Sequence, residues 1–133
     1  MALVANRVNP DADIIFVRIA GLTKSGTMDT YSINEVTKAL TWVVANKQKY
    51  NIVSVSASMG NHNLNPGPNY CPIRSTHSVL IGDMNKLIAL NVATMFAAGN
   101  GRDYKRIDFP ACIPEAVSIG GATEDDAMAP YSN

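Results

Sequence analysis

The feature that most constrains the fold is an alternation of short apolar runs with longer amphipathic segments. Three runs rich in β-branched residues, at 52–57, 92–98 and 116–121, end in small residues and are predicted to be strands. Segments with helical spacing of apolar residues precede the first two runs. Because strands that alternate with helices are typical of parallel sheets with helical crossovers, the sequence predicts an α/β fold with a mostly parallel sheet flanked by helices in three layers.

An earlier strand is predicted at residues 13–19, followed by a Gly/Ser/Thr-rich surface connection over residues 21–30. Ser32 and Glu35 fit a capping box, in which a hydroxyl and a carboxylate satisfy amide groups at a helix start. Apolar residues then recur at steps of three and four and predict a helix that ends near residues 47–50. Its apolar stripe, with Trp42 at the border, consists of Val36, Ala39, Leu40, Val43 and Val44.

A long loop with three prolines is predicted at residues 61–75. A second helix is expected to begin among Ser75, Thr76 and Ser78 and to run to Asn91. Its predicted apolar face consists of Val79, Leu80, Met84, Leu87 and Ile88. In the strand at 52–57, the two intervening serines leave two alternatives open, a half-exposed strand or one buried under helices, because serine is small and can bond locally.

Charge and hydropathy exclude several classes of partner. Eleven basic and eleven acidic residues leave no net charge, so nothing electrostatic favours nucleic-acid binding. No apolar run approaches the ~20 residues that a membrane span needs, and residues 1–5 lack the basic leader of a signal peptide. We therefore expect neither a nucleic-acid nor a membrane partner, and the sequence assigns no compartment.

The cysteines and histidines show no metal-site spacing. Cys71 and Cys112 lie far apart without a Cys-x-x-Cys motif, and buried free thiols are favoured over a disulfide. His62, in a Pro/Gly-rich loop, and His77, at a predicted helix start, are interpreted as surface or capping residues rather than as a general base. No metal site is expected.

The most informative polar residue is Asn100, which lies between Gly99 and Gly101 just past a predicted buried strand. In open α/β sheets, ligands bind at that edge. A side-chain amide fixed there can donate to the oxyanion that forms during acyl transfer. Asn100 equally fits a turn, because asparagine tolerates left-handed geometry.

Five motifs, in this order and spacing, resemble the subtilisin-like serine peptidases (subtilases, peptidase family S8). They are Ser58-Met59-Gly60, the run 96–101, Phe109-Pro110-Ala111, the run 116–122 and Tyr131-Ser132-Asn133. The resemblance extends from about residue 10 to residue 133 and implies an incomplete subtilisin-like fold, with residues 1–133 as the central part of one peptidase domain. The family's Asp, His and Gly-Thr-Ser motifs are not in this sequence. The resemblance therefore implies a serine endopeptidase whose triad lies outside this chain, and the chain alone is predicted to be inactive.

The resemblance also implies roles for individual residues. Asn100 matches the oxyanion-hole asparagine, and Phe109-Pro110 matches an aromatic-Pro pair at the pocket floor whose peptide bond the family holds cis. Ser132 belongs to a structural turn and is not the nucleophile. Three segments match the family's substrate-binding residues. The edge segment that pairs with a peptide matches Ser25, Gly26 and Thr27. One wall of the primary specificity pocket matches Ser58, Met59 and Gly60, and the opposite wall matches Ala97, Ala98 and Gly99. Ser56 and Ala57 depart from the family's usual Asn-Met.

Asp108 directly precedes Phe109-Pro110 and so matches the base of the primary pocket, where a carboxylate would attract a Lys or Arg side chain. A surface ion pair of Asp108 with Arg102, Lys105 or Arg106 remains the alternative. The expected partner is a peptide or protein substrate. No cofactor is expected in this chain, although the family resemblance allows structural calcium in the complete protein.

The alternative function is a non-catalytic peptide-binding module or pseudopeptidase that keeps the cleft without the triad. Flanking sequence with the triad motifs would favour the enzyme. A nucleotide-binding domain is disfavoured because no Gly-x-Gly-x-x-Gly motif or P-loop is present. If flanking strands and helices cover the sheet in the complete protein, the isolated chain is expected to associate through its exposed core surface.

Overall fold

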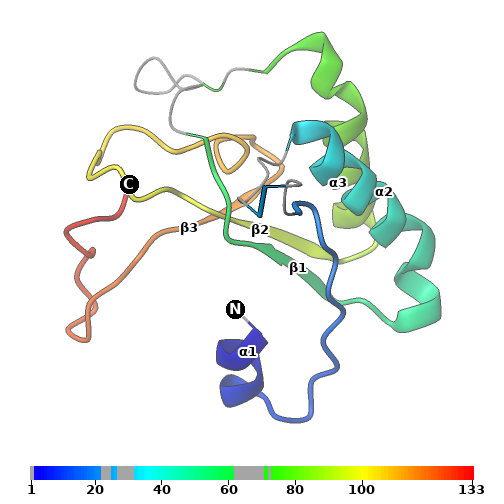
Figure 1. Ribbon diagram of the computed structural model, residues 1–133, viewed down its shortest axis with the longest axis horizontal. Helices are drawn as coiled ribbons and strands as arrows, with labels where there is room; N and C mark the ends of the chain where they lie inside the picture. Colours follow the sequence, from blue (N-terminus) through cyan, green and yellow to red (C-terminus); the bar gives the residue numbers. More distant parts are fainter. Residues whose placement is uncertain (1, 22–24, 27–31, 62–70, 72) are drawn as a thin grey trace. The chain divides into compact units, whose positions relative to one another are not determined.

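The computed structural model describes residues 2–21, 25–26, 32–61, 71 and 73–133 (Figure 1). The chain divides into two compact units, Met1–Ala39 and Leu40–Asn133, and each is described by itself. The first contains helix α1 (Ala2–Val8) and the first turns of helix α2 (Ile33–Tyr50). None of the helices in the described ranges combines the length and the apolar character that crossing a bilayer requires.

The strand predicted at residues 13–19 does not form. These residues have no strand hydrogen bonds, and their large apolar side chains, such as Phe16, are exposed. An apolar run becomes a strand only when a neighbouring strand accepts and donates its backbone hydrogen bonds. Within the described residues this segment has no such neighbour.

Helix α2 begins where the sequence predicted it. The Glu35 carboxylate accepts a hydrogen bond from the Ser32 backbone N–H at 3.2 Å, which is one half of the predicted capping box. The other half differs, because the Ser32 hydroxyl donates to the same carboxylate instead of accepting from a backbone amide. This hydroxyl is the main reason that the pKa of Glu35 lies below its usual value. Three members of the predicted stripe are buried: Val36, Leu40 and Val43.

The second unit contains a parallel sheet of three strands in the order β1-β2-β3. They are β1 (Ser54–Ala57), β2 (Ala93–Ala97) and β3 (Val117–Ile119), each within a predicted strand. In β1 the two serines are exposed and Val55 and Ala57 are half-buried. This strand is therefore half-exposed and is not buried under helices. The sheet with its helices has the predicted α/β architecture.

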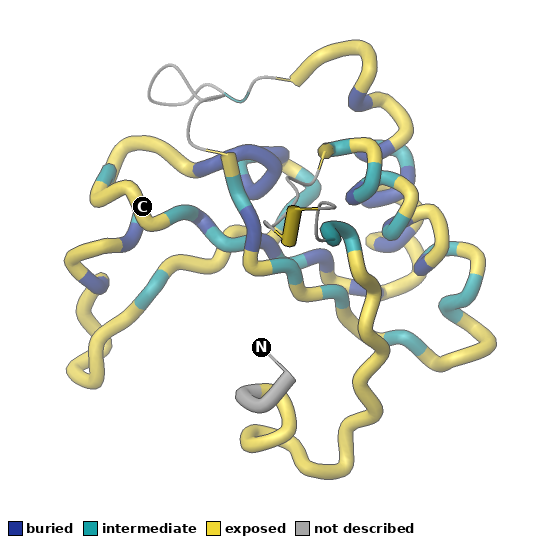
Figure 2. Tube along the Cα trace, viewed as in Figure 1, coloured by how far each residue is buried: buried dark blue, intermediate teal, exposed yellow. Residues whose placement is uncertain are grey.

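Helix α3 (Ser78–Ala89), preceded by the short 3-10 helix η2 (Ser75–His77), packs against β2 (Figure 2). Leu80, Met84 and Leu87 are buried as predicted. Val79 and Ile88 were wrongly placed on the apolar face, since they are 56% and 50% exposed. At 100° per residue, these two positions lie at opposite flanks of the stripe through 80, 84 and 87, so the helix turns them away from the sheet.

A buried carboxylate joins α3 to the middle of α2. Asp83 accepts hydrogen bonds from the Thr41 hydroxyl and from the Lys86 ammonium at 2.8 Å, and its side chain is almost fully buried. Burial by itself raises the pKa of Asp83, but the two donors and the positive charge of Lys86 outweigh it and hold this pKa below its usual value. Asp83 is therefore ionised in the folded chain near neutral pH.

The two cysteines form a disulfide, with Cα atoms 5.5 Å apart, so the prediction of free thiols is wrong. Cys112 follows the Phe109-Pro110 turn, and its N–H donates to the Asp108 carbonyl at 3.0 Å. The fold brings this turn to Cys71, although 41 positions separate the two residues in sequence. Closing a loop of that length contributes about 4 kcal/mol of stability in the chain-entropy model.

Candidate functional site

The carboxyl ends of β1 and β2 lie side by side. The two strands are parallel and hydrogen-bonded, with Ala57 opposite Phe96, so the segments that follow them leave the sheet at the same edge. These are the two predicted pocket walls, Ser58 to Gly60 and Ala97 to Gly99. Ligands bind at this edge of open α/β sheets, and the structure brings both walls there.

The Asp108 side chain lies close to Gly60 and Gly99, one in each of the two predicted walls. Asp108 is 3% exposed, which contradicts the alternative of a surface ion pair; Arg106 pairs instead with Asp103. A Cβ atom built on Gly60 would lie 2.9 Å from Asp108 Oδ2, and one built on Gly99 would lie 2.5 Å from the same atom. Both positions therefore need glycine because the carboxylate is so close.

Asn100 lies at the bend that follows β2. Its side chain is exposed, and its amide has no hydrogen-bond partner among the described residues. The residue before it, Gly99, has a φ of 123°, a conformation that side chains strongly disfavour. This bend presents the Asn100 amide to solvent at the end of the partly buried strand β2.

Backbone hydrogen bonds hold both sides of the Asn100 bend. The Ala98 N–H donates to the Ile119 carbonyl, and the Asp108 N–H donates to the Ala98 carbonyl, both at 2.8 Å. On the other side, the Arg102 N–H donates to the Tyr131 carbonyl at 3.2 Å.

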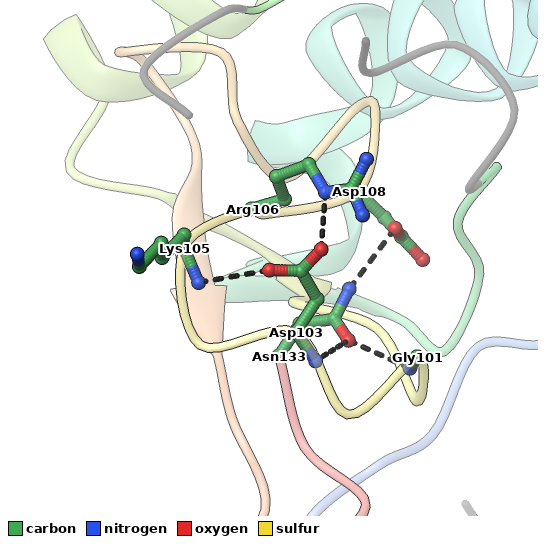
Figure 3. A network of polar contacts seen from close by, with 6 residues as sticks. All are labelled: Gly101, Asp103, Lys105, Arg106, Asp108 and Asn133. Atoms are coloured by element: carbon green, nitrogen blue, oxygen red, sulfur yellow. Dashed lines mark hydrogen bonds and ion pairs between the residues drawn. The ribbon is translucent and has the colours of Figure 1, made fainter. Parts of the chain in front are cut away.

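Asn133 is a site residue whose position the sequence did not predict. Its side-chain oxygen accepts hydrogen bonds from the Gly101 N–H at 2.6 Å and the Asp103 N–H at 3.3 Å, and its side-chain nitrogen donates to Asp108 Oδ1 at 3.2 Å (Figure 3). The motif that contains Asn133 was recognised as a turn. No local signal shows that this turn reaches Gly101, 32 positions earlier.

The peptide bond between Phe109 and Pro110 is cis, as the family resemblance implied. Phe109 is buried, and its ring lies 4.8 Å from the ring of His77, centroid to centroid. His77 caps η2, because its Nδ1 accepts the Arg74 N–H at 3.2 Å, which confirms the capping interpretation. It is buried rather than exposed, and burial, followed by the charge of Arg74, lowers the pKa of His77.

The other predicted residues fall in the first unit, in the C-terminal turn or outside the described residues. Ser25 and Gly26 are exposed residues of the first unit, and Gly26 has a φ of 80°. Thr27 and His62 lie outside the described residues. Ser132 is fully buried, and its hydroxyl accepts from the Gly121 N–H at 2.9 Å, as a structural turn residue would. The described residues contain no group of three or more potential metal ligands.

Comparison with known proteins gives one family match. The family model described as "Subtilase family" (Peptidase_S8) matches residues 2–133. No curated protein matches the chain.

Several solved structures have a similar fold. A cold-adapted subtilisin-like serine proteinase is 24% identical over 84% of this chain, with a TM-score of 0.54. Sphericase is 17% identical over 84% of the chain, with a TM-score of 0.57. The PatG macrocyclase in complex with peptide is 16% identical over 77% of the chain, with a TM-score of 0.54. The chain spans 34%, 33% and 26% of those three proteins, about a third of their length or less.

Proposed function

The chain belongs to the subtilase family, because the family match covers residues 2–133, and from this membership we propose that the complete protein is a serine endopeptidase. This chain is the central part of its peptidase domain and supplies the substrate cleft and one oxyanion donor. The Asp, His and Ser of the triad lie outside this chain. The observation that carries the proposal is the exposed Asn100 amide on a bend held at the carboxyl end of β2.

In this mechanism the serine oxygen bonds to the peptide carbonyl carbon while the histidine takes the hydroxyl proton. The carbonyl oxygen then carries a negative charge, which the Asn100 amide stabilises by donating a hydrogen bond. Collapse of the intermediate breaks the C–N bond, and the histidine gives its proton to the leaving amine. Water then removes the acyl group by the same steps.

The substrate is proposed to be a peptide or protein lying along the edge where β1 and β2 end. One similar structure, the PatG macrocyclase, holds a peptide, which supports this class of substrate. The segment Ser25, Gly26 and Thr27 is proposed to pair with the peptide as an added strand.

Labelling with a fluorophosphonate, which reacts with activated serines, tests the proposal. The full-length protein should label stoichiometrically and lose labelling after heat denaturation, whereas residues 1–133 alone should not label. Labelling of any serine within residues 1–133 would contradict the assignment of the triad to the flanking sequence. A folded full-length protein that binds peptide without labelling would instead be the non-catalytic binding module.

Asp108 is proposed to select a basic residue before the cleaved bond. Its buried carboxylate lies between the two walls, where a Lys or Arg side chain would find a charge-assisted partner. With peptide libraries, the full-length protein should prefer Lys or Arg, and Asp108→Asn should lose that preference by about tenfold or more in kcat/KM, an effect of at least ~1.4 kcal/mol.

The matched control is Asp103→Asn, which removes a carboxylate that pairs with Arg106 and does not belong to the proposed pocket. It should leave the preference unchanged. Equal selectivity of the parent and Asp108→Asn would exclude Asp108 as the selecting group.

A further inference from the structure

We propose that Asn133 is a positioning residue, which sets the direction of the Asn100 amide by holding the bend that carries it. The inference rests on the proposed function of Asn100. The family resemblance implied only that Asn133 belongs to a structural turn, and the proposal gives this residue a role of its own.

The contacts surround Asn100 on both sides. The Asn133 N–H donates to the Gly99 carbonyl at 3.1 Å, directly before Asn100. The Asn133 side-chain oxygen accepts the Gly101 N–H at 2.6 Å, directly after Asn100. One residue therefore fixes both peptide groups adjacent to the proposed oxyanion donor.

Asn133 is itself held in place. Its side-chain nitrogen donates to Asp108 Oδ1, and Asp108 is buried against Gly60 and Gly99. Because the amide group donates to Asp108 through nitrogen, its oxygen must face Gly101 and Asp103 (Figure 3). The orientation of the Asn133 amide is thus determined by a buried carboxyl group, and the bend takes its direction from that amide.

This arrangement matters because an oxyanion donor works through preorganisation. The Asn100 side chain has no hydrogen bond of its own among the described residues, so only its backbone limits where the amide points. Displacement by about 1 Å at a reacting centre can cost about 100-fold in rate. Removing the Asn133 side chain frees the Gly101 and Asp103 N–H groups and lets the bend move.

The test is a double-mutant cycle in the full-length protein. The concentration of active enzyme used to calculate kcat is measured by fluorophosphonate labelling. Asn133→Ala should lower kcat about 10- to 100-fold, with KM within about twofold. In the Asn100→Ala background, Asn133→Ala should have almost no further effect, because the donor it positions is gone. Equal effects in the two backgrounds would overturn the positioning role. If Asn100→Ala alone leaves kcat unchanged, the proposed oxyanion function itself fails.

Hydrogen exchange gives a second measurement. In Asn133→Ala, the Gly101 and Asp103 amides should lose protection while the Ala98 amide, bonded to Ile119, keeps it. If Asn133→Ala does not fold, Asn133→Asp is the second variant. It removes the donation to Asp108 and places a second carboxylate beside that residue, so the Gly101 and Asp103 amides should lose protection; full protection of both amides in the folded variant would overturn the proposal. Arg106→Ala is the control, since it removes the ion pair on the other side of Asp103 and should leave kcat and all three amides unchanged.

Discussion

Asn100→Ala should lower kcat of the full-length protein by about two to three orders of magnitude, a size taken over from the oxyanion asparagine of subtilisin-like peptidases. KM should stay within about threefold, because the hydrogen bond strengthens only as charge develops on the substrate oxygen. The exposed amide has no hydrogen-bond partner among the described residues, so its removal breaks no hydrogen bond within that part of the chain. Steady-state kinetics on one peptide substrate, with thermal melting of both proteins, measures the effect.

The matched control for Asn100 is Asn85→Ala. Asn85 is another exposed asparagine, on α3, and its amide bonds to the Ile81 carbonyl at 3.1 Å and to Glu115. It lies outside the proposed cleft, and kcat should not change. Identical kcat for the parent and Asn100→Ala would remove Asn100 from the mechanism, whereas a tenfold rise of KM with kcat unchanged would make it a ground-state binding residue.

Gly99→Ala should destabilise the full-length protein by roughly 2–6 kcal/mol and abolish its activity. A φ of 123° costs a residue with a side chain about 1–3 kcal/mol. The added Cβ would also lie 2.5 Å from Asp108 Oδ2 and even closer to the Asn133 side-chain nitrogen, and relieving such overpacking costs about 1–3 kcal/mol more. Denaturant unfolding of parent and variant measures the loss.

Gly82→Ala is the matched control for Gly99. Gly82 lies within α3, and a Cβ built there meets no atom within 4 Å. Alanine favours a helix over glycine by about 0.5–1 kcal/mol, so this variant should be slightly more stable than the parent and equally active. A Gly99→Ala protein with the parent's stability would show that the bend is not held as described.

The sequence by itself determined the elements whose stabilising interactions are local. Helix α2 follows from the spacing of Val36, Leu40 and Val43, and its start from Glu35 three residues after Ser32, because both patterns act within one or two turns. The three strands follow from β-branched runs separated by crossover segments. The resemblance added what local patterns cannot supply, the cis bond before Pro110.

The tertiary structure decided which distant groups meet. Cys71 and Cys112 join across 41 positions, residues 13–19 find no strand partner in the described chain, and Val79 and Ile88 turn away from the sheet. Asp108 is buried against two glycines and bonded to Asn133, although neighbouring basic residues slightly favoured a surface ion pair from sequence. Local patterns determine which backbone hydrogen bonds form within a segment, whereas these contacts depend on how segments close on one another, and that is a property of the packed chain.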